Sequence, residues 1–129
     1  MKQNLFYSYN SGKLPKGCQY CVRGEKLVLF VTGYCPRRCY FCPLSDDKYQ
    51  KDVIFANERK AVGLKDILLE AKNMGAKGAG ITGGDPLARI ERTAGFIVAL
   101  KKKYGGNFHI HLYTSLNLAT SINLERLFR

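Results

Sequence analysis

Three short apolar runs, rich in β-branched or aromatic residues, occur at residues 26–33, 78–84 and 107–115. The first two do not alternate cleanly between apolar and polar residues, which is typical of strands that are buried on both faces. We therefore predict three strands, separated by long intervals of a different pattern.

Helical patterns fill those intervals. Residues 62–75 place apolar side chains on one helical stripe that ends at a glycine, and residues 85–106 form a second stripe with a proline near its start and two glycines at its end. Residues 122–129 have the pattern of the opening of a third helix. Strands that alternate with helices of this length indicate right-handed βαβ crossovers and a parallel sheet.

The number of predicted strands bears on the fold class. A closed barrel needs more strands than this chain contains, and a third strand followed by a short helix leaves at least one parallel edge unpaired. We therefore expect an α/β fold in which residues 26–129 form the first part of something longer. Residues 1–25 precede it as an N-terminal extension.

Composition narrows the class of protein. The chain has 129 residues, of which 46% are hydrophobic and 24% charged, and these are ordinary values for one globular domain. No run approaches the ~20 apolar residues of a membrane-spanning helix, and the first residues lack the apolar segment of a secretory signal. We therefore expect a cytoplasmic protein that does not act at a membrane.

The chain is strongly basic, with 21 lysines and arginines against 10 acidic residues and a formal net charge of +11. Such an excess attracts polyanions and anionic small molecules. The basic residues are scattered over predicted helix faces and ends, and no groove-reading motif accompanies them, which favours a solvated basic surface. Nucleic acid stays open as a partner.

Cysteines supply the first candidate chemistry. Three of the five, Cys35, Cys39 and Cys42, form a C-x3-C-x2-C pattern directly after the first predicted strand. Thiols stay reduced in a protein that is not exported, so the cluster favours metal or redox chemistry over disulfides. Thiolates suit zinc and iron–sulfur clusters, and three ligands leave one iron of a four-iron cluster open to a cofactor.

A zinc site is the alternative interpretation. Cys18-x2-Cys21 and Cys39-x2-Cys42, separated by residues 22–38, have the spacing of a four-cysteine zinc site. Together with the charge, this spacing predicts a zinc-stabilised basic module that binds nucleic acid. That hypothesis leaves the first cysteine of the triplet unused and does not explain the glycine-rich turn "TGGDP" that follows the second predicted strand.

The order of these segments predicts where they meet. Chemistry in parallel sheets lies at the carboxyl ends of the strands, where the cysteine segment, residues 82–86, and the pair Thr114 and Ser115 all fall. We therefore expect these segments to crowd onto one edge. His109 and His111 lie two residues apart and share a face of the third strand, where packing or a polar role is favoured over metal binding.

Two motifs together resemble the radical SAM (S-adenosylmethionine) superfamily. "CPRRCYFC" matches the family signature C-x3-C-x-aromatic-C with Phe41 as the aromatic residue, and "GGDP" resembles the GGEP motif with Asp85 in place of glutamate. The segment around the cysteines also resembles an archaeal-type group related to pyruvate formate-lyase activating enzymes. The resemblance covers roughly residues 18–129 and implies the front half of a partial (β/α)6 TIM-like barrel, truncated at its third helix.

The resemblance also implies cofactors and site residues. Cys35, Cys39 and Cys42 would bind a [4Fe-4S] cluster whose open iron is chelated by SAM. Phe41 would lie by the adenine, and the methionyl ammonium would be received by Gly83, Gly84, Asp85 and Pro86. An electron donor such as ferredoxin or flavodoxin would drive cleavage of SAM to a 5′-deoxyadenosyl radical, which abstracts hydrogen from a substrate of unknown identity. Apart from the resemblance, the C-x2-C pair of Cys18 and Cys21 predicts a knuckle that holds an accessory metal, zinc or a further cluster, with reduced thiols as the alternative.

Overall fold

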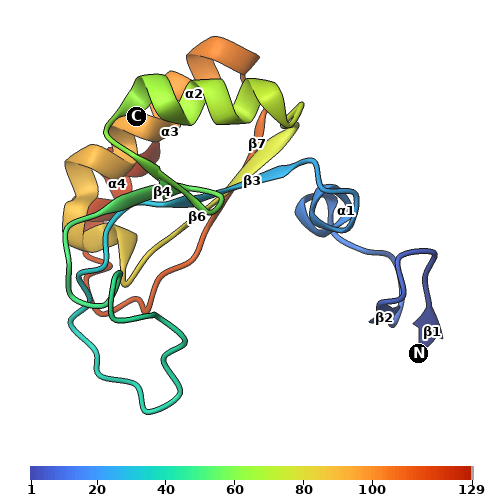
Figure 1. Cartoon of the computed structure of the whole chain (residues 1–129), viewed down its shortest axis with the longest axis horizontal. Coiled ribbons are helices and arrows are strands. Elements are labelled where there is room, and N and C mark those ends of the chain that lie inside the picture. The colour runs from blue at the N-terminus through green and yellow to red at the C-terminus, as the bar shows by residue number, and fades with distance from the viewer. Residues whose placement is uncertain (129) are drawn as a thin grey trace.

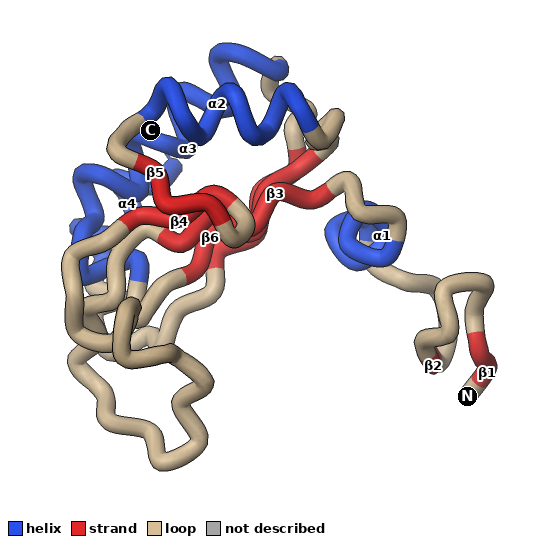
Figure 2. The backbone as a smooth tube through the Cα atoms, viewed as in Figure 1, coloured by secondary structure: helices blue, strands red, loops and turns tan. Residues whose placement is uncertain are grey.

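A five-stranded mixed sheet lies at the centre of the molecule in the computed structural model, which describes residues 1–128 (Figures 1 and 2). The strand order across the sheet is β5-β4-β3-β6-β7. In chain order the strands are β3 (Lys26–Phe30), β4 (Ile54–Ala56), β5 (Arg59–Ala61), β6 (Gly78–Thr82) and β7 (His109–Leu112).

The three predicted strands are confirmed as the parallel part of this sheet. β3, β6 and β7 pair in parallel, and Lys26, Gly78 and His109 lie opposite one another at their amino ends. The crossovers are helical, as the periodicity predicts. They comprise α2 (Leu64–Asn73), the 3-10 turn η1 (Pro86–Arg89) and α3 (Ile90–Tyr104), and α4 (Ser121–Phe128) follows β7.

The expectation of an entirely parallel sheet is wrong at one edge. β4 pairs with β3 in antiparallel orientation and continues into β5 through a tight turn. Asn57 makes that turn with a φ of 52°, and its side-chain oxygen accepts a hydrogen bond from the Val28 backbone N–H at 3.0 Å. Asparagine tolerates this left-handed conformation better than most residues, so one side chain both makes the turn and fastens it to β3.

The two faces of the sheet differ. One face packs against α2 and α3, and its core includes Leu27, Leu29, Ile67, Ile81 and Leu100, all fully buried. On the other face, called here the open face, Val28 is 48% exposed. Within residues 1–128 the sheet does not close into a barrel, so the structure has the α/β layering of the prediction, and the partial barrel is not confirmed.

The N-terminal extension forms a small hairpin, β1 (Lys2–Gln3) and β2 (Tyr9–Asn10), followed by the helix α1 (Lys16–Val22). Cys18 and Cys21 therefore lie on a helix and not in the knuckle that we expected. α1 packs across the amino end of the open face, where Gly17 lies against two imidazoles. A Cβ atom at Gly17 would lie 2.3 Å from His111 Cε1 and 2.6 Å from His109 Nε2.

None of the helices in residues 1–128 combines the length and the apolar character that crossing a membrane requires.

Candidate functional site

Residues 31–53, which we call the cysteine loop, connect β3 to β4. Because β4 lies antiparallel beside β3, the loop leaves the sheet and returns to it at the same place. Its two ends are joined by hydrogen bonds from Gly33 N to Lys51 O at 2.8 Å and from Gln50 N to Gly33 O at 3.0 Å. A Cβ atom at position 33 would lie 1.6 Å from Lys48 O, so only glycine allows this approach.

The cysteine loop meets the turn after β6 at a cavity of about 230 Å³. Its lining includes most of the residues singled out in the sequence: Cys35, Cys39, Phe41, Cys42, Gly83, Gly84 and Ser115. These residues come from the carboxyl ends of all three parallel strands. The prediction that the segments meet at one edge of the sheet is therefore confirmed.

The three thiols of the loop have the chemistry that an iron–sulfur cluster requires. All five cysteines are free, and Cys39 and Cys42 also line a second cavity, which is formed by residues of the cysteine loop alone. Within residues 1–128 no three His, Cys, Asp or Glu side chains form a group that could hold a single metal ion. Three soft ligands around one open cavity fit a cluster that leaves room for a further ligand, and their roles as ligands stay a prediction.

The glycine pair of "GGDP" lets two backbones touch. A Cβ atom at Gly84 would lie 2.5 Å from both Gly33 O and Tyr34 O, and one at Gly83 would lie 2.5 Å from Thr32 O. Gly84 N also donates a hydrogen bond to Thr32 O at 2.8 Å. The pair therefore holds the start of the cysteine loop against the end of β6, whatever ligand the cavity receives.

Asp85 and Pro86 lie behind the cavity lining and are buried. The Asp85 carboxylate is fully buried and accepts hydrogen bonds from Thr114 Oγ1 at 2.8 Å, from Ser115 N at 3.1 Å and from Leu87 N at 3.0 Å. It also accepts one from the Ser115 hydroxyl at 2.5 Å. The carboxylate thus ties the end of β6 to the end of β7, which places Ser115 at the cavity.

A second carboxylate, which sequence reasoning missed, anchors the end of the cysteine loop. Asp52 accepts hydrogen bonds from Arg92 at 2.6 and 3.1 Å, from Thr32 Oγ1 at 2.9 Å and from Arg89 at 3.1 Å. The hydrogen bonds from Arg92, then those from Thr32 and Arg89, hold the pKa of Asp52 well below its usual range, against the opposing effect of burial. The signal in the sequence was weak, because nothing distinguishes Asp52 from the neighbouring surface acids.

Two further polar contacts fix the cavity wall. The side-chain amide of Gln50 donates to Cys35 O at 2.8 Å, so the loop's return segment holds the first cysteine in place. Arg37 lines the cavity and its Nε donates to Asn117 Oδ1 at 2.9 Å, which links the cysteine loop to the segment after β7. Neither Gln50 nor Asn117 belongs to a motif, so only the fold identifies them.

The two C-x2-C pairs lie at opposite ends of the sheet. α1 carries Cys18 and Cys21 at the amino ends of the parallel strands, whereas Cys39 and Cys42 lie beyond their carboxyl ends (Figure 1). The four thiols therefore do not form one zinc site in the part of the chain that the structure describes. The structure therefore gives no support to a zinc-stabilised module that binds nucleic acid through these four cysteines.

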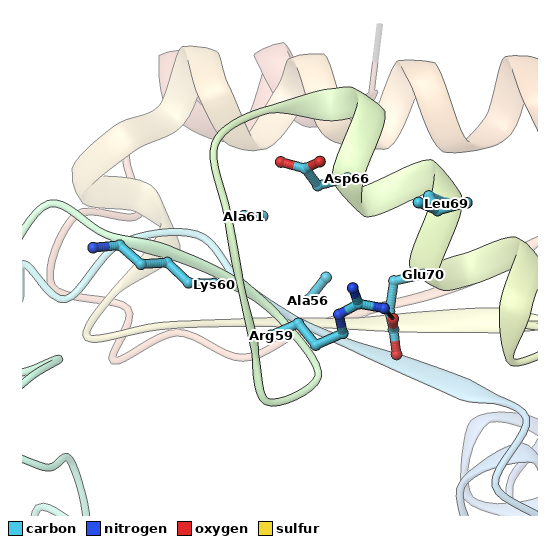
Figure 3. A pocket seen from close by; sticks show the side chains of 7 residues that line it. All are labelled: Ala56, Arg59, Lys60, Ala61, Asp66, Leu69 and Glu70. Atoms are coloured by element: carbon cyan, nitrogen blue, oxygen red, sulfur yellow. Dashed lines mark hydrogen bonds and ion pairs between the residues drawn. The ribbon is translucent and has the colours of Figure 1, made fainter.

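A smaller cavity, of about 60 Å³, lies between the β4–β5 hairpin and α2 (Figure 3). Three of its four charged side chains have partners, because Arg59 pairs with Glu70 at 3.4 Å and Asp66 accepts a hydrogen bond from Val62 N at 2.8 Å. Its volume suits a few water molecules. We assign no function to it.

Comparison with known proteins agrees with this geometry. Residues 29–129 match the model of the radical SAM superfamily. A protein of Methanocaldococcus jannaschii named "Putative glycyl-radical enzyme activating enzyme" is 51% identical over 118 residues, which cover 92% of this chain and 31% of that relative. The chain thus spans about a third of the length of that relative, and no solved structure matches it. The match extends from the end of β3 through the cysteine loop, the glycine turn and the strands β6 and β7, and the chain therefore belongs to the radical SAM superfamily.

Proposed function

We propose that this chain holds a [4Fe-4S] cluster and SAM in a protein that cleaves SAM reductively. The observation that carries the proposal is the shared cavity, where three free cysteines meet the glycine turn that follows the next strand. Membership of the radical SAM superfamily supports the same chemistry.

The motif residues in and behind the cavity wall each have a role in this proposal. Cys35, Cys39 and Cys42 hold the cluster, which when bound supplies one electron to break the C5′–S bond of SAM, giving methionine and a 5′-deoxyadenosyl radical. Phe41, which is 70% exposed in the cavity lining, lies by the adenine. The backbone of Gly83 and Gly84 receives the methionyl ammonium, with Asp85 and Pro86 fixing the turn from behind.

We further propose that the substrate is a polypeptide, from which the radical removes a hydrogen atom at a glycine. The name of the Methanocaldococcus jannaschii relative supports this class of substrate. A reductant protein such as ferredoxin or flavodoxin supplies the electron. A cytoplasmic location for this protein would place it together with such reductant proteins.

We also propose an accessory metal at Cys18 and Cys21. The two residues lie three apart on α1, a spacing that places side chains on the same side of a helix. Residues other than these two cysteines supply the remaining ligands of this metal. Metal analysis of the Cys18→Ser and Cys21→Ser double variant tests the assignment, and an unchanged metal content contradicts it.

The main proposal is tested by reconstitution without oxygen. The chain is incubated with iron and sulfide, reduced with dithionite in the presence of SAM, and assayed for 5′-deoxyadenosine and methionine by liquid chromatography. We expect about four irons and four sulfides per chain and the formation of both products. Cys39→Ser should abolish product formation, whereas Cys21→Ser, a matched change of an exposed thiol on α1, should leave it intact.

Two results would contradict the proposal. Stoichiometric zinc without sulfide in protein purified anaerobically would exclude a cluster at these cysteines. A fully loaded cluster that yields no 5′-deoxyadenosine would limit the chain to cluster binding.

A further inference from the structure

We propose that the open face carries an anion-binding subsite centred on Lys26, which receives a carboxylate or phosphate group of the substrate. The inference rests on the proposed function, because it places the substrate on the open face below the cavity. It adds a chemical requirement that the cofactors do not impose, namely a negative charge on the substrate.

Lys26 is buried and has no acidic partner in the part of the chain that the structure describes. It is 8% exposed, and its Nζ lies 2.9 Å from His111 Nδ1 and 2.9 Å from the hydroxyl oxygen of Tyr113. Nζ also lies 5.2 Å from the centre of the Tyr113 ring. No carboxylate within residues 1–128 forms an ion pair with Lys26. Lysines are rarely buried without a counter-charge, so this position indicates that the charge is met by a ligand.

The histidines beside Lys26 point to the same kind of ligand. His109 Nε2 is buried and has no hydrogen-bond partner among the described residues. Burial lowers the pKa of His109 and of His111, and the positive charge of Lys26 lowers both further. Lys16, on α1, adds positive charge near His109. The site thus offers N–H donors and positive charge, and no acidic side chain of residues 1–128 pairs with it, which is the arrangement that an anion requires.

The subsite lies below the cofactor cavity on the same face of the sheet. Gly80 lies opposite Val28 of the open face, and Thr82 belongs to the same face because it lies two residues further along β6. A Cβ atom at Gly80 would lie 3.0 Å from Lys26 Cε, so the missing side chain is what allows the lysine to lie there. Thr82 lines the cavity, and two residues along a strand span about 7 Å. A substrate that enters the cavity can therefore place an anionic group at Lys26.

The experiment follows the imidazole Cε1–Hε1 signals of His109 and His111 by NMR in the intact chain at neutral pH. Potassium phosphate and potassium acetate are titrated separately, with potassium chloride at matched ionic strength as the reference. The variants are Lys26→Gln, Lys26→Arg and Tyr113→Phe. Lys103→Gln is the matched control, because it removes the same charge from an exposed position on α3.

We expect at least one anion to shift both histidine signals in a saturable way that chloride does not reproduce. The affinity should fall at least tenfold in Lys26→Gln, fall severalfold in Tyr113→Phe, and stay within threefold of the native value in Lys26→Arg and Lys103→Gln. Saturation by phosphate alone assigns a phosphorylated substrate group, by acetate alone a carboxylate, and by both an anion of either kind.

Shifts that fail to saturate, or that chloride reproduces, overturn the proposal. Native affinity in Lys26→Gln also overturns it, and if that variant does not fold, native affinity in Tyr113→Phe does so. The titration needs neither cluster nor SAM, so its failure is separable from failure of the proposed function. Absent histidine shifts with normal SAM cleavage reject the subsite alone, whereas saturable shifts without SAM cleavage reject the SAM chemistry alone.

Discussion

Asp85 shows how a motif residue can serve the fold and the site together. Its carboxylate is fully buried and its hydrogen bonds go to Leu87, Thr114 and Ser115, so it does not face the cavity. A shorter acid than glutamate suits this task, because both acceptor oxygens must stay close to the end of β6. The carboxylate thereby fixes the position of a hydroxyl at the cavity wall.

The first prediction concerns this residue. Asp85→Ala should lower the free energy of unfolding by about 3 kcal/mol, because it leaves several buried donors without an acceptor. Urea denaturation followed by circular dichroism measures the change. Asp47→Ala, at an exposed position of the cysteine loop, is the control and should stay within about 0.5 kcal/mol of the native chain. Equal effects of the two substitutions would refute the structural role of Asp85.

The second prediction concerns two glycines whose replacement by alanine should change stability in opposite directions. Gly84→Ala should destabilise the chain by about 1–3 kcal/mol, because a Cβ atom would press on the carbonyls of Gly33 and Tyr34. Gly95→Ala should stabilise it by about 1 kcal/mol, because Gly95 lies on an exposed side of α3 with nothing within 4 Å of the added atom. The two midpoints of urea denaturation should move in opposite directions even without iron or SAM.

At the scale of elements, Asp52 joins the cysteine loop to the start of α3. Its hydrogen bonds reach Arg92 on α3, Arg89 at the end of η1 and Thr32 just after β3. The pKa of Asp52 is lower in the folded chain than in the unfolded chain, where it is about 3.9. The Asp52 carboxylate therefore stabilises the fold fully above about pH 3.9, and this stabilisation is lost as the pH falls through the lower folded-state pKa.

The third prediction follows from this dependence of stability on pH. Asp52→Asn should cost about 2 kcal/mol of stability at pH 7, since hydrogen bonds to charged groups are lost. The difference from the native chain should shrink when urea denaturation is repeated below about pH 4. A difference that stays constant from pH 7 to pH 3 would show that the carboxylate charge is not what joins these elements.

The parallel strands and both crossover helices were predictable, because their apolar runs are long and their periods are distinct. The β4–β5 hairpin was not, since its strands have three residues each and carry exposed Arg59 and Lys60 on an edge. α1 was missed because seven residues give little periodicity, and its N-terminal cap is Pro15 without a side-chain hydrogen bond. The predicted second helix begins as a 3-10 turn, where Asp85 accepts from Leu87 N.

For the site, sequence reasoning found the residues that belong to motifs and missed the residues that position them. Cysteines and paired glycines are chemically unusual, and the rule for parallel strands brings them to one edge. Gln50 and Asp52 are ordinary surface types whose roles depend on the loop returning beside its own start. That return depends on β4, which the pattern did not reveal.

At the scale of the whole molecule, exposed thiols lie at both ends of the parallel strands. Cys21 lies on α1 at the amino end, and Cys42 lies in the cysteine loop at the carboxyl end, and both are exposed. The reactivity of Cys21 therefore reports on the amino end of the parallel strands, and that of Cys42 reports on their carboxyl end.

The fourth prediction compares their reactivity. In the metal-free chain both thiols should react rapidly with N-ethylmaleimide, as read by peptide mass spectrometry. After cluster assembly the labelling of Cys42 should fall at least tenfold, whereas that of Cys21 should fall only if the accessory metal proposed on α1 is also bound. Protection of Cys21 together with Cys42 would place metal at both ends, and continued labelling of Cys42 would remove it from the cluster ligands.

The closure of the cysteine loop at Gly33 has a consequence for how this protein can diversify. Because the loop leaves and re-enters the sheet at one point, the residues between Tyr34 and Tyr49 form a cassette whose length and composition can change without altering the strand register. Exchange of this cassette between relatives should carry the cysteine spacing with it while leaving the scaffold intact. The loop can thus evolve its ligand set almost independently of the fold that bears it.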